Sequence, residues 1–263
     1  MERIDKLLSH EGFGSRKDIR KLLRNTVVLL NDKQIFDCSI NINPETDILN
    51  VDGKIVDLHQ NIYLMMNKIK NTVSSNKDGD HQTVFDYLDD NLRTPYFQDK
   101  LHLIGRLDID TEGLLLFTTD GLLTHKLISP KNNISKTYFV VLKEKESDEH
   151  KKQIEDAFSK GIHIPSEDND AEADCKPAKI KWASQNECIE NCKNTSWKSD
   201  TFAAAAFLSI TEGKYHQVKR MFRAIGNEVI YLKRIKEGNL TLDKNLKPGE
   251  YKYIDNLPDL LDL

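Results

Sequence analysis

The sequence predicts an α+β protein, in which a small N-terminal α/β module precedes a larger domain built on a mixed, mainly antiparallel sheet. Strand-like runs outnumber helical ones, and most of them follow one another without regular helical crossovers. Longer strand-like apolar runs begin near residue 62, after a polar stretch at 57–61 that we expect to be a linker. We therefore expect one domain over residues 1–58 and a second over 62–263, a length that allows both to bury a core.

The N-terminal module is predicted to begin with two short helices and to continue with β-like runs. Apolar residues spaced along 4–8 predict the first helix, and the glycines within 12–14 end it. Ser15, followed three positions later by Asp18, is typical of the start of a second helix. The runs TVVLLN and ILNVDGKIV come next, and the Asp-Gly pair at 52–53 predicts a hairpin turn.

The second predicted helix carries a stripe of basic side chains. These are Arg16, Lys17, Arg20, Lys21 and Arg24. Only Asp18 interrupts them, and the arginines recur at four-residue intervals, which places them along one side of a helix. Such a stripe is either a solvated helix face or a surface that contacts phosphate groups, and the pattern alone leaves both interpretations open.

The larger domain is predicted mainly as strands. The strand-like runs are IYLMMNKIK, LHLIGRL, LLLFTT, KTYFVVLK, AAAAFLSIT, EVIYLKRI and YKYI. TVFDYL predicts a helical turn or helix, and VKRMFRAI predicts an amphipathic helix that Gly226 ends. Residues 144–200, which include the acidic run SEDNDAEAD, are expected to form a helix followed by a solvated loop.

The composition is that of an ordinary soluble globular protein, with 38% hydrophobic and 30% charged residues. The N-terminal stretch MERIDKLLSHEGF lacks the apolar core of a secretory signal and no later stretch resembles a membrane span, so we expect a cytoplasmic protein without a membrane partner. The four cysteines are expected to be reduced thiols and not zinc ligands. The net charge of −4 argues against non-specific coating of nucleic acid but allows a local basic face.

The run GRLDIDTEG at residues 105–113 permits three interpretations. It is an acidic turn between strands, the opening of a calcium loop, or a loop that carries a catalytic carboxylate, Asp108. The calcium loop is disfavoured because it needs a bidentate glutamate where Thr119 stands, and because residues 114–117 would have to be loop instead of strand.

Three segments of the larger domain occur in an order that is specific to one family. They are GRLDIDTEGLLLFTTDG, KTY at 136–138 and EGKYHQVKRMF at 212–222. In this order they resemble the signature motifs of the RsuA-type pseudouridine synthases, which modify ribosomal RNA. The segments RIDKLLS, GSRKDIRKLLRN, VVLLN and VDGK of the N-terminal module resemble the alpha-L RNA-binding motif. The resemblance covers nearly the whole chain.

The resemblance implies a reaction and the residues that carry it out. Uridine becomes pseudouridine when the bond from ribose to N1 breaks and the uracil is rejoined through C5, which requires no redox change, cofactor or metal. Asp108 is implied as the carboxylate, acting either as a covalent nucleophile or as a base on the sugar. Lys219 is implied as its cationic partner. Tyr138, otherwise a packed strand tyrosine, is implied to stack on the flipped uracil and to accept a proton from C5.

Other basic residues are expected to bind RNA. Arg106 is expected to contact phosphate or to fill the gap that the flipped base leaves. Lys214 and Arg220 are expected to contact the RNA backbone, as is the basic stripe of the second helix, whereas Arg223 is equally well explained as a solvated helix residue. His216, beside a strand-to-helix turn, is assigned a structural role by default.

The sequence departs from the family pattern at one turn. Members of this branch commonly have Asn-Lys-Pro-x-Gly at the start of the catalytic domain, whereas this chain has NKIKN, with Ile69 and Asn71 in place of Pro and Gly. The sequence therefore does not secure the tight turn there. Lys219, together with Tyr215 and His216, resembles the small-subunit type more than its large-subunit relatives.

The resemblance as a whole implies an enzyme that isomerises one uridine in small-subunit ribosomal RNA, either free or in a partly assembled subunit, and we expect the enzyme to be a monomer. Two alternatives stay open on the sequence. One is a synthase that acts on large-subunit ribosomal RNA, and the other is a non-catalytic RNA-binding assembly factor that has kept the fold.

Overall fold

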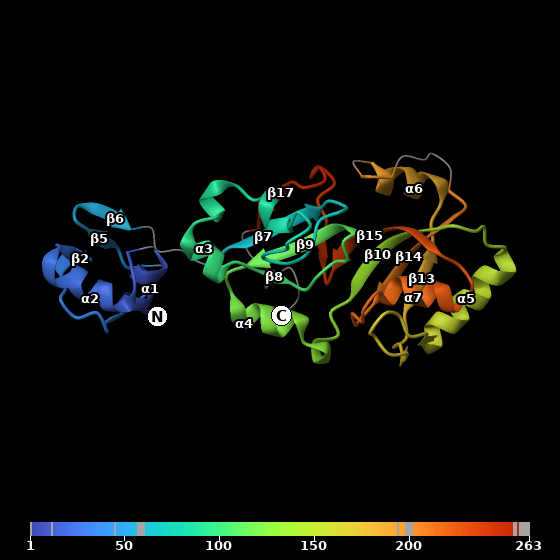
Figure 1. Cartoon of the computed structure of the whole chain (residues 1–263), viewed down its shortest axis with the longest axis horizontal. Helices are drawn as coiled ribbons and strands as arrows, with labels where there is room; N and C mark the ends of the chain where they lie inside the picture. Colours follow the sequence, from blue (N-terminus) through green and yellow to red (C-terminus); the bar gives the residue numbers. More distant parts are fainter. Residues whose placement is uncertain are drawn as a thin grey trace. The chain divides into compact units, whose positions relative to one another are not determined.

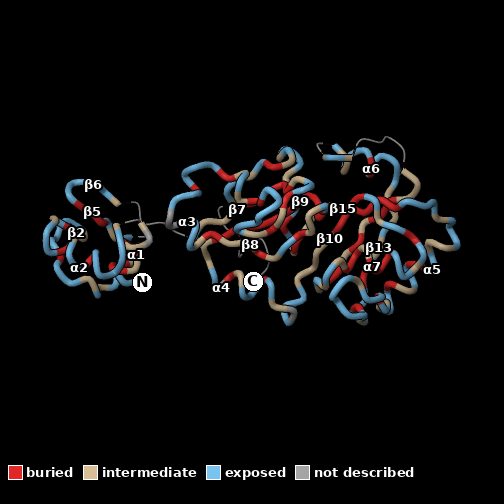
Figure 2. Tube along the Cα trace, in the orientation of Figure 1, coloured by how far each residue is buried: buried red, intermediate tan, exposed pale blue. Residues whose placement is uncertain are grey.

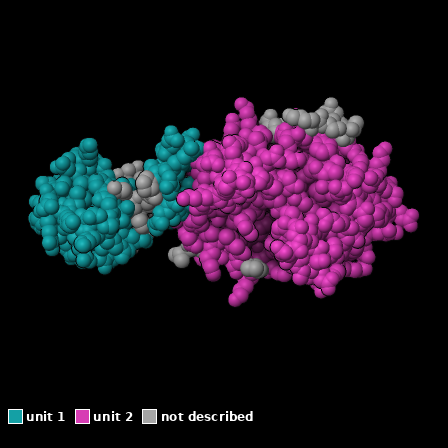
Figure 3. All heavy atoms as spheres, in the orientation of Figure 1, with its two compact units in different colours: residues 1–62, 89–101 teal, residues 63–88, 102–263 magenta. Residues whose placement is uncertain are grey.

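The chain divides into two compact units, which Figure 3 colours separately. One comprises Met1–Ile62 with Asp89–Leu101, and the other comprises Tyr63–Leu88 with His102–Leu263. The computed structural model describes residues 2–11, 13–44, 46–56, 61–193, 195–197, 202–254 and 257. Gly12 and residues 57–60 of the predicted linker lie outside these ranges.

The N-terminal unit begins with the two predicted helices, α1 (Ile4–His10) and α2 (Arg16–Asn25). Ser15 caps α2, because its hydroxyl accepts a hydrogen bond from the Asp18 amide while the Asp18 carboxylate accepts one from the Ser15 amide. This reciprocal pair satisfies two amides that the first turn of a helix leaves unbonded. The apolar side of α2 packs into the core of the unit, so its start and its orientation follow from local sequence.

The remaining elements of this unit are short. A four-stranded antiparallel sheet has the order β3-β2-β5-β6. Asp52 and Gly53 connect β5 to β6 with φ of 54° and 82°, the left-handed pair that a tight hairpin turn requires, so the predicted hairpin is confirmed. The elements are β1 (Glu2–Arg3), β2 (Val28–Leu30), β3 (Lys33–Gln34), β4 (Asn41–Ile42), β5 (Leu49–Val51), β6 (Lys54–Val56), η2 (Asp90–Leu92) and α3 (Pro95–Lys100).

The second unit is built on a nine-stranded sheet whose main path is β13-β14-β10-β15-β9-β7-β17. Its strands are β7 (Tyr63–Lys68), β8 (His102–Ile104), β9 (Glu112–Thr118), β10 (Lys136–Leu142), β13 (Lys179–Trp182), β14 (Ala204–Ile210), β15 (Val229–Glu237), β16 (Leu240–Thr241) and β17 (Tyr251–Tyr253). Among the described strands of this sheet only the β9·β15 pair is parallel. The prediction of an α+β fold with a mainly antiparallel sheet is confirmed.

Helices cover both faces of this sheet (Figure 1). They are η1 (Val84–Tyr87), α4 (Gly121–Ile128), η3 (Pro130–Asn132), α5 (Asp148–Lys160), α6 (Gln185–Cys192) and α7 (Gln217–Ala224). Side chains alternate along β10, so Phe139 and Val141 pack with Cys188 of α6, while Tyr138 faces away from them. Phe158 of α5 and Phe222 of α7 meet edge to face, 5.3 Å between ring centroids.

Burial is concentrated in the central strands (Figure 2). All seven residues of β9 are buried, and residues 114–117, which a calcium loop would need as loop, lie within this strand. The four cysteines are free thiols. No helix in the described part of the chain combines the length and apolar character needed to cross a bilayer.

The segment 144–200 differs from the prediction in its second half. The expected helix is present as α5, but the chain then forms the hairpin β11 (His163–Ile164) with β12 (Ala173–Asp174), the strand β13 and the helix α6. The acidic run SEDNDAEAD supplies the turn and the second strand of the β11–β12 hairpin. The loop prediction was wrong because long-range pairing with β14, and not local propensity, forms β13.

Candidate active site

Asp108 lies in the loop between β8 and β9, and the segment that follows β7 holds this loop in place. The amide of Asn71 donates to the carbonyl of Ile109 at 2.8 Å. The hydroxyl of Ser74 donates to the carbonyl of Leu107 at 2.8 Å, and the Leu107 amide lies 3.1 Å from the same hydroxyl. The backbone groups of the residues on both sides of Asp108 are therefore fixed by hydrogen bonds.

The turn that the NKIKN departure left unsecured is present. Asn71 has φ of 64°, in the left-handed region that glycine adopts easily and asparagine tolerates better than most residues. The hydroxyl of Thr72 donates to the carbonyl of Ile69 at 2.7 Å and closes the turn. Asparagine thus replaces the usual glycine without loss of the conformation that contacts the Asp108 loop.

Lys68, at the end of β7, supports the Asp108 loop from below the pocket lining, a role that the sequence patterns did not reveal. Its side chain is fully buried, and its ammonium donates to the carbonyls of Thr111 at 2.9 Å and Ile109 at 3.3 Å. Burial lowers the pKa of Lys68 to about 8, and the charges of Asp110 and Asp108 limit that fall. The signal was a lysine close behind the apolar residues of the run IYLMMNKIK.

Lys219 of α7 joins the carboxylates of the loop. Its ammonium donates to Asp108 Oδ2 at 2.9 Å and to Asp110 Oδ1 at 2.6 Å. Burial alone would lower the pKa of Lys219, but hydrogen bonding to Asp110 and the charge of Asp108 outweigh it and raise that pKa. Burial likewise opposes ionisation of Asp110, and Lys219 prevails, so the pKa of Asp110 is lowered. Asp108 Oδ1 accepts no hydrogen bond from any residue in the described ranges.

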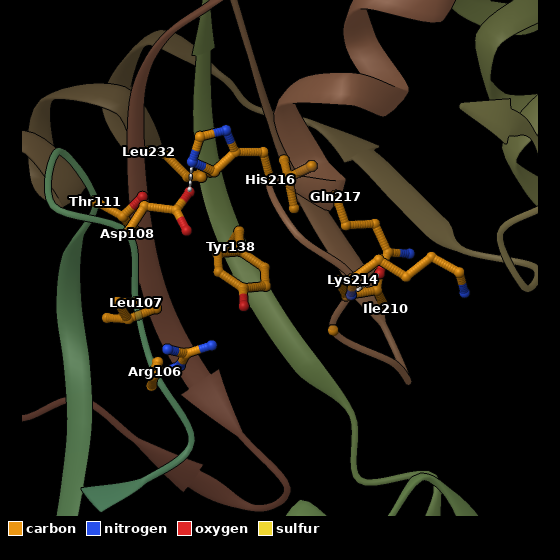
Figure 4. A pocket seen from close by; sticks show the side chains of 12 residues that line it. Arg106, Leu107, Asp108, Thr111, Tyr138, Ile210, Lys214, His216, Gln217 and Leu232 are labelled. Atoms are coloured by element: carbon orange, nitrogen blue, oxygen red, sulfur yellow. Dashed lines mark hydrogen bonds and ion pairs between the residues drawn. The ribbon is translucent and has the colours of Figure 1, made fainter. Parts of the chain in front are cut away.

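The Asp108 carboxylate borders a pocket that encloses about 450 Å³, including its open mouth. Tyr138, from β10, and Arg106 border the same pocket (Figure 4). Tyr138 is 8% exposed, and burial raises the pKa of its hydroxyl. Leu107 and Leu232 supply apolar wall.

Two of the predicted RNA contacts lie at this pocket. Arg106 is exposed beside it, two residues before Asp108. Lys214 is half-buried at its edge and forms an ion pair with Glu212. The structure thus brings both cations to the pocket that Asp108 borders, and their contact with RNA stays a prediction.

Arg220 does not fit the predicted contact with RNA. The residue is 1% exposed, and its guanidinium donates to the carbonyls of Pro165, Tyr215 and Ala171 at 2.8, 3.0 and 2.6 Å. The prediction was wrong because this arginine lies on the inner side of α7, where it satisfies backbone carbonyls of the β11–β12 hairpin.

His216 is placed in the pocket and not in a purely structural position. Its Nε2 lies 3.8 Å from Asp108 Oδ2, a contact drawn in Figure 4. The residue precedes α7 with φ of 47°. Sequence reasoning missed it because proximity to Asp108 depends on the packing of α7 beside the β8–β9 loop, which no local pattern encodes.

The basic stripe of α2 lies on the solvent side of the N-terminal unit. Ile19 and Leu23 are the buried residues of this helix. The stripe is exposed throughout, and none of its members forms an ion pair with a carboxylate in the described ranges. Its members are Arg16, Lys17, Arg20, Lys21 and Arg24.

Known proteins resemble this chain along almost its whole length. A family model described as RNA pseudouridylate synthase matches residues 62–224. The chain is 39% identical over 251 residues to a Bacillus subtilis (strain 168) protein named "Uncharacterized RNA pseudouridine synthase YtzG", which covers 95% of this chain and 93% of the relative. It is 34% identical over 250 residues to "Ribosomal small subunit pseudouridine synthase A" of Escherichia coli (strain K12), covering 95% of both.

A second small-subunit relative and a solved structure agree with these matches. "Ribosomal small subunit pseudouridine synthase A" of Haemophilus influenzae is 35% identical over 250 residues, covering 95% of this chain and 94% of the relative. A crystal structure of a pseudouridylate synthase matches with a TM-score of 0.60 at 31% identity, covering 99% of this chain and 98% of the other. The Asp108 loop, Tyr138 and α7 surround the pocket, and the family model, the relatives and the solved structure all indicate the same family. The chain therefore belongs to the RNA pseudouridylate synthase family, isomerases that convert uridine in RNA into pseudouridine.

Proposed function

We propose that this enzyme isomerises one uridine of small-subunit ribosomal RNA, with Asp108 as the carboxylate that acts on the ribose. The observation that carries the proposal is the arrangement of this carboxylate at the pocket. Lys219 holds Oδ2 at 2.9 Å, while Oδ1 has no hydrogen-bond partner among the described residues. One oxygen is therefore anchored and the other is available to a substrate.

The reaction needs only such a carboxylate and a way to move one proton. The bond between N1 and C1′ breaks, a bond between C5 and C1′ forms, one proton leaves C5 and one reaches N1, so all atoms balance within the nucleoside. Asp108 Oδ1 serves this sequence either by attacking C1′ or by taking a proton from the sugar. The pocket geometry supports both routes.

Tyr138 and Arg106 fit the handling of a flipped base. The ring of Tyr138 gives the detached uracil a surface to stack on, and its hydroxyl is the group assigned to the C5 proton. Extrusion of a base costs a few kcal/mol. Arg106, exposed beside the pocket, offsets that cost by contacting the phosphate or filling the vacated space.

Separate features support the small subunit as the source of the substrate and the contact with an RNA backbone. Relatives at 34% and 35% identity over 95% of the chain are named for the small subunit. The exposed basic stripe of α2 supports contact between the N-terminal unit and an RNA backbone. Both assignments are part of the proposal.

The test is to map pseudouridine in both ribosomal RNAs of cells that lack this gene, before and after its return. We expect the wild-type gene to restore one pseudouridine in the small-subunit RNA and Asp108→Asn to restore none, because the amide cannot act as nucleophile or base. Asp110→Asn is the matched comparison, since Asp110 contacts the same Lys219. It should retain at least part of the activity.

The outcomes separate the parts of the proposal. Restored pseudouridine in the large-subunit RNA would contradict the substrate, and restored modification by Asp108→Asn would contradict the role of this carboxylate. Equal loss in Asp108→Asn and Asp110→Asn would also remove the distinction between the two aspartates.

A further inference from the structure

The β11–β12 hairpin brings a second carboxylate to the pocket residue His216. Glu167 Oε2 lies 3.5 Å from His216 Nδ1, and His216 Nε2 lies 3.8 Å from Asp108 Oδ2. The side chains of Glu167 and His216 are only 17% and 23% exposed. An imidazole thus stands between two carboxylates, one of which is the proposed reactive group.

Glu167 Oε2 and His216 Nδ1 face each other at 3.5 Å without forming a hydrogen bond. Glu167 Oε2 and His216 Nδ1 are both buried and have no hydrogen-bond partner within the described part of the chain. Buried polar atoms without partners are costly, and they are rare in native proteins. Catalytic hydrogen bonds are often long in a free enzyme and shorten when the substrate binds.

The hairpin is fixed to α7, so Glu167 is not a loosely placed loop residue. Arg223 Nη1 lies 3.1 Å from Glu167 Oε1 and holds the other oxygen of that carboxylate. Arg220 bonds the carbonyls of Pro165 and Ala171, on either side of the hairpin turn. Through these contacts, the buried Arg220 attaches the hairpin to α7, the helix that carries Lys219.

The backbone of His216 has an uncommon conformation. Its φ of 47° and ψ of 28° lie in the left-handed region, where residues other than glycine are infrequent and often functional. The His216 ring stacks on Tyr215 with 3.8 Å between ring centroids, and the Tyr215 hydroxyl donates to Asp168 Oδ2 at 2.9 Å. Asp168 of the hairpin therefore restrains Tyr215, the residue that precedes His216.

We propose that His216 is a further residue of the catalytic pocket and that its ring fixes the Asp108 carboxylate through Oδ2. In this proposal, Glu167 is the positioning residue that orients the His216 ring. His216 and Lys219 both approach Oδ2, from separate positions on the turn and on α7. Held on that side, the carboxylate keeps Oδ1 directed at the ribose. The proposal rests on the role of Asp108 given above.

Variants distinguish this role from simple packing. Glutamine at 216 places an amide N–H near the position of Nε2, whereas asparagine places one near Nδ1. We therefore expect His216→Gln to retain more activity than His216→Asn. In single-turnover reactions, His216→Asn and Glu167→Gln should lower the chemical rate by roughly 10- to 100-fold, with RNA affinity changed little, because the reacting carboxylate is displaced and RNA contacts are not.

The control is Asp170→Asn, which removes one charge from the same hairpin turn, at an exposed side chain that forms no ion pair within the described residues, and it should leave the rate unchanged. Because Glu167 acts through His216, the Glu167→Gln/His216→Asn double variant should be no slower than His216→Asn alone. A wild-type rate for Glu167→Gln, or losses that multiply in the double variant, would overturn the proposal.

A second readout does not depend on the substrate. In the free full-length enzyme, the ring ¹⁵N chemical shifts of His216 should change in Glu167→Gln and in Asp108→Asn but not in Asp170→Asn. Unchanged shifts in Glu167→Gln would overturn the proposal even in an active enzyme. The rates of all variants are measured on the RNA that the wild type modifies. If that RNA is not from the small subunit, the proposed function fails but the role of His216 and Glu167 is still tested.

Discussion

At the scale of single residues, Lys219 is the cation that holds the reactive carboxylate in place. It bonds Asp108 and Asp110 together, and its own pKa is raised by that pairing against the effect of burial. We expect Lys219→Met to lower the single-turnover rate by roughly a hundredfold, since loss of one member of a largely buried pair costs a few kcal/mol.

Lys219→Arg is the informative control for that prediction, because guanidinium keeps the positive charge and the capacity to bond a carboxylate. It should recover most of the activity. If Lys219→Met were as fast as wild type, the ion pair would have no part in the reaction.

Lys68 makes a prediction about stability and pH. Its pKa falls from 10.5 to about 8 on folding because burial disfavours the charged form. Between these values the unfolded chain binds more protons at this site than the folded chain, so the contribution of Lys68 to stability rises with pH from about 8 to 10.5 and is constant below. The comparison variant is Lys68→Met.

The measurement is the free energy of unfolding of wild type and Lys68→Met, by urea titration at several pH values. The difference, wild type minus variant, should increase as the pH rises from 8 to 10.5. A difference that falls over this window would show that the folded protein favours the charged lysine.

At the scale of elements, the parallel contact between β9 and β15 lies immediately beyond the Asp108 loop. Gly113 pairs with Arg234 there and has φ of 103°. A Cβ at this position would lie 2.2 Å from the carbonyl oxygen of Arg234, so no side chain fits unless the strands separate. Only glycine permits this register.

We therefore expect Gly113→Ala to destabilise the protein by at least roughly 1–3 kcal/mol and to reduce activity by shifting the loop. Urea unfolding and the single-turnover rate measure the two effects. Gly79→Ala is the matched control, because a Cβ there meets no atom within 4 Å. Equal stability of the two variants would contradict the close strand contact.

Helix α7 shows why the role of each of its basic residues could be assigned only from the tertiary structure. VKRMFRAI predicts an amphipathic helix, and α7 confirms it, but the periodicity does not say which cation faces inward. Arg220 packs under the β11–β12 hairpin, while Lys219, one residue earlier, reaches the Asp108 loop. Two adjacent basic residues thus have unrelated roles.

At the scale of the whole molecule, the N-terminal unit is expected to contribute RNA affinity and not chemistry. The α2 stripe is exposed and unpaired with carboxylates in the described ranges, and each phosphate contact releases bound counterions. In the full chain, Arg20→Ala/Arg24→Ala should weaken binding of substrate RNA. It should also make the slope of log affinity against log salt concentration shallower, by the amount expected for the loss of roughly one to two phosphate contacts.

The rate at saturating RNA should be unchanged in that variant. Lys33→Ala/Lys54→Ala removes the same charge from exposed positions of the sheet in the same unit and should alter binding less. Binding measured against salt concentration decides the matter, and equal effects of the two double variants would assign α2 no special role.

The sequence by itself determined the features that short-range physics controls. The Ser15–Asp18 cap, the Asp52-Gly53 hairpin and the strand and helix around the third motif all form where local patterns place them. The order of the motifs also identified the family and pointed to Asp108. Cap, turn and periodicity are local because the interacting groups lie within a few residues.

Only the tertiary structure decided which side chains meet at the site. Lys68, His216 and Glu167 come from three distant segments, and no spacing in the sequence joins them to Asp108. Strand β13 and the inward face of Arg220 likewise depend on partners far along the chain. The physical reason is that burial and long-range backbone pairing select these contacts, and both exist only once the sheet has assembled.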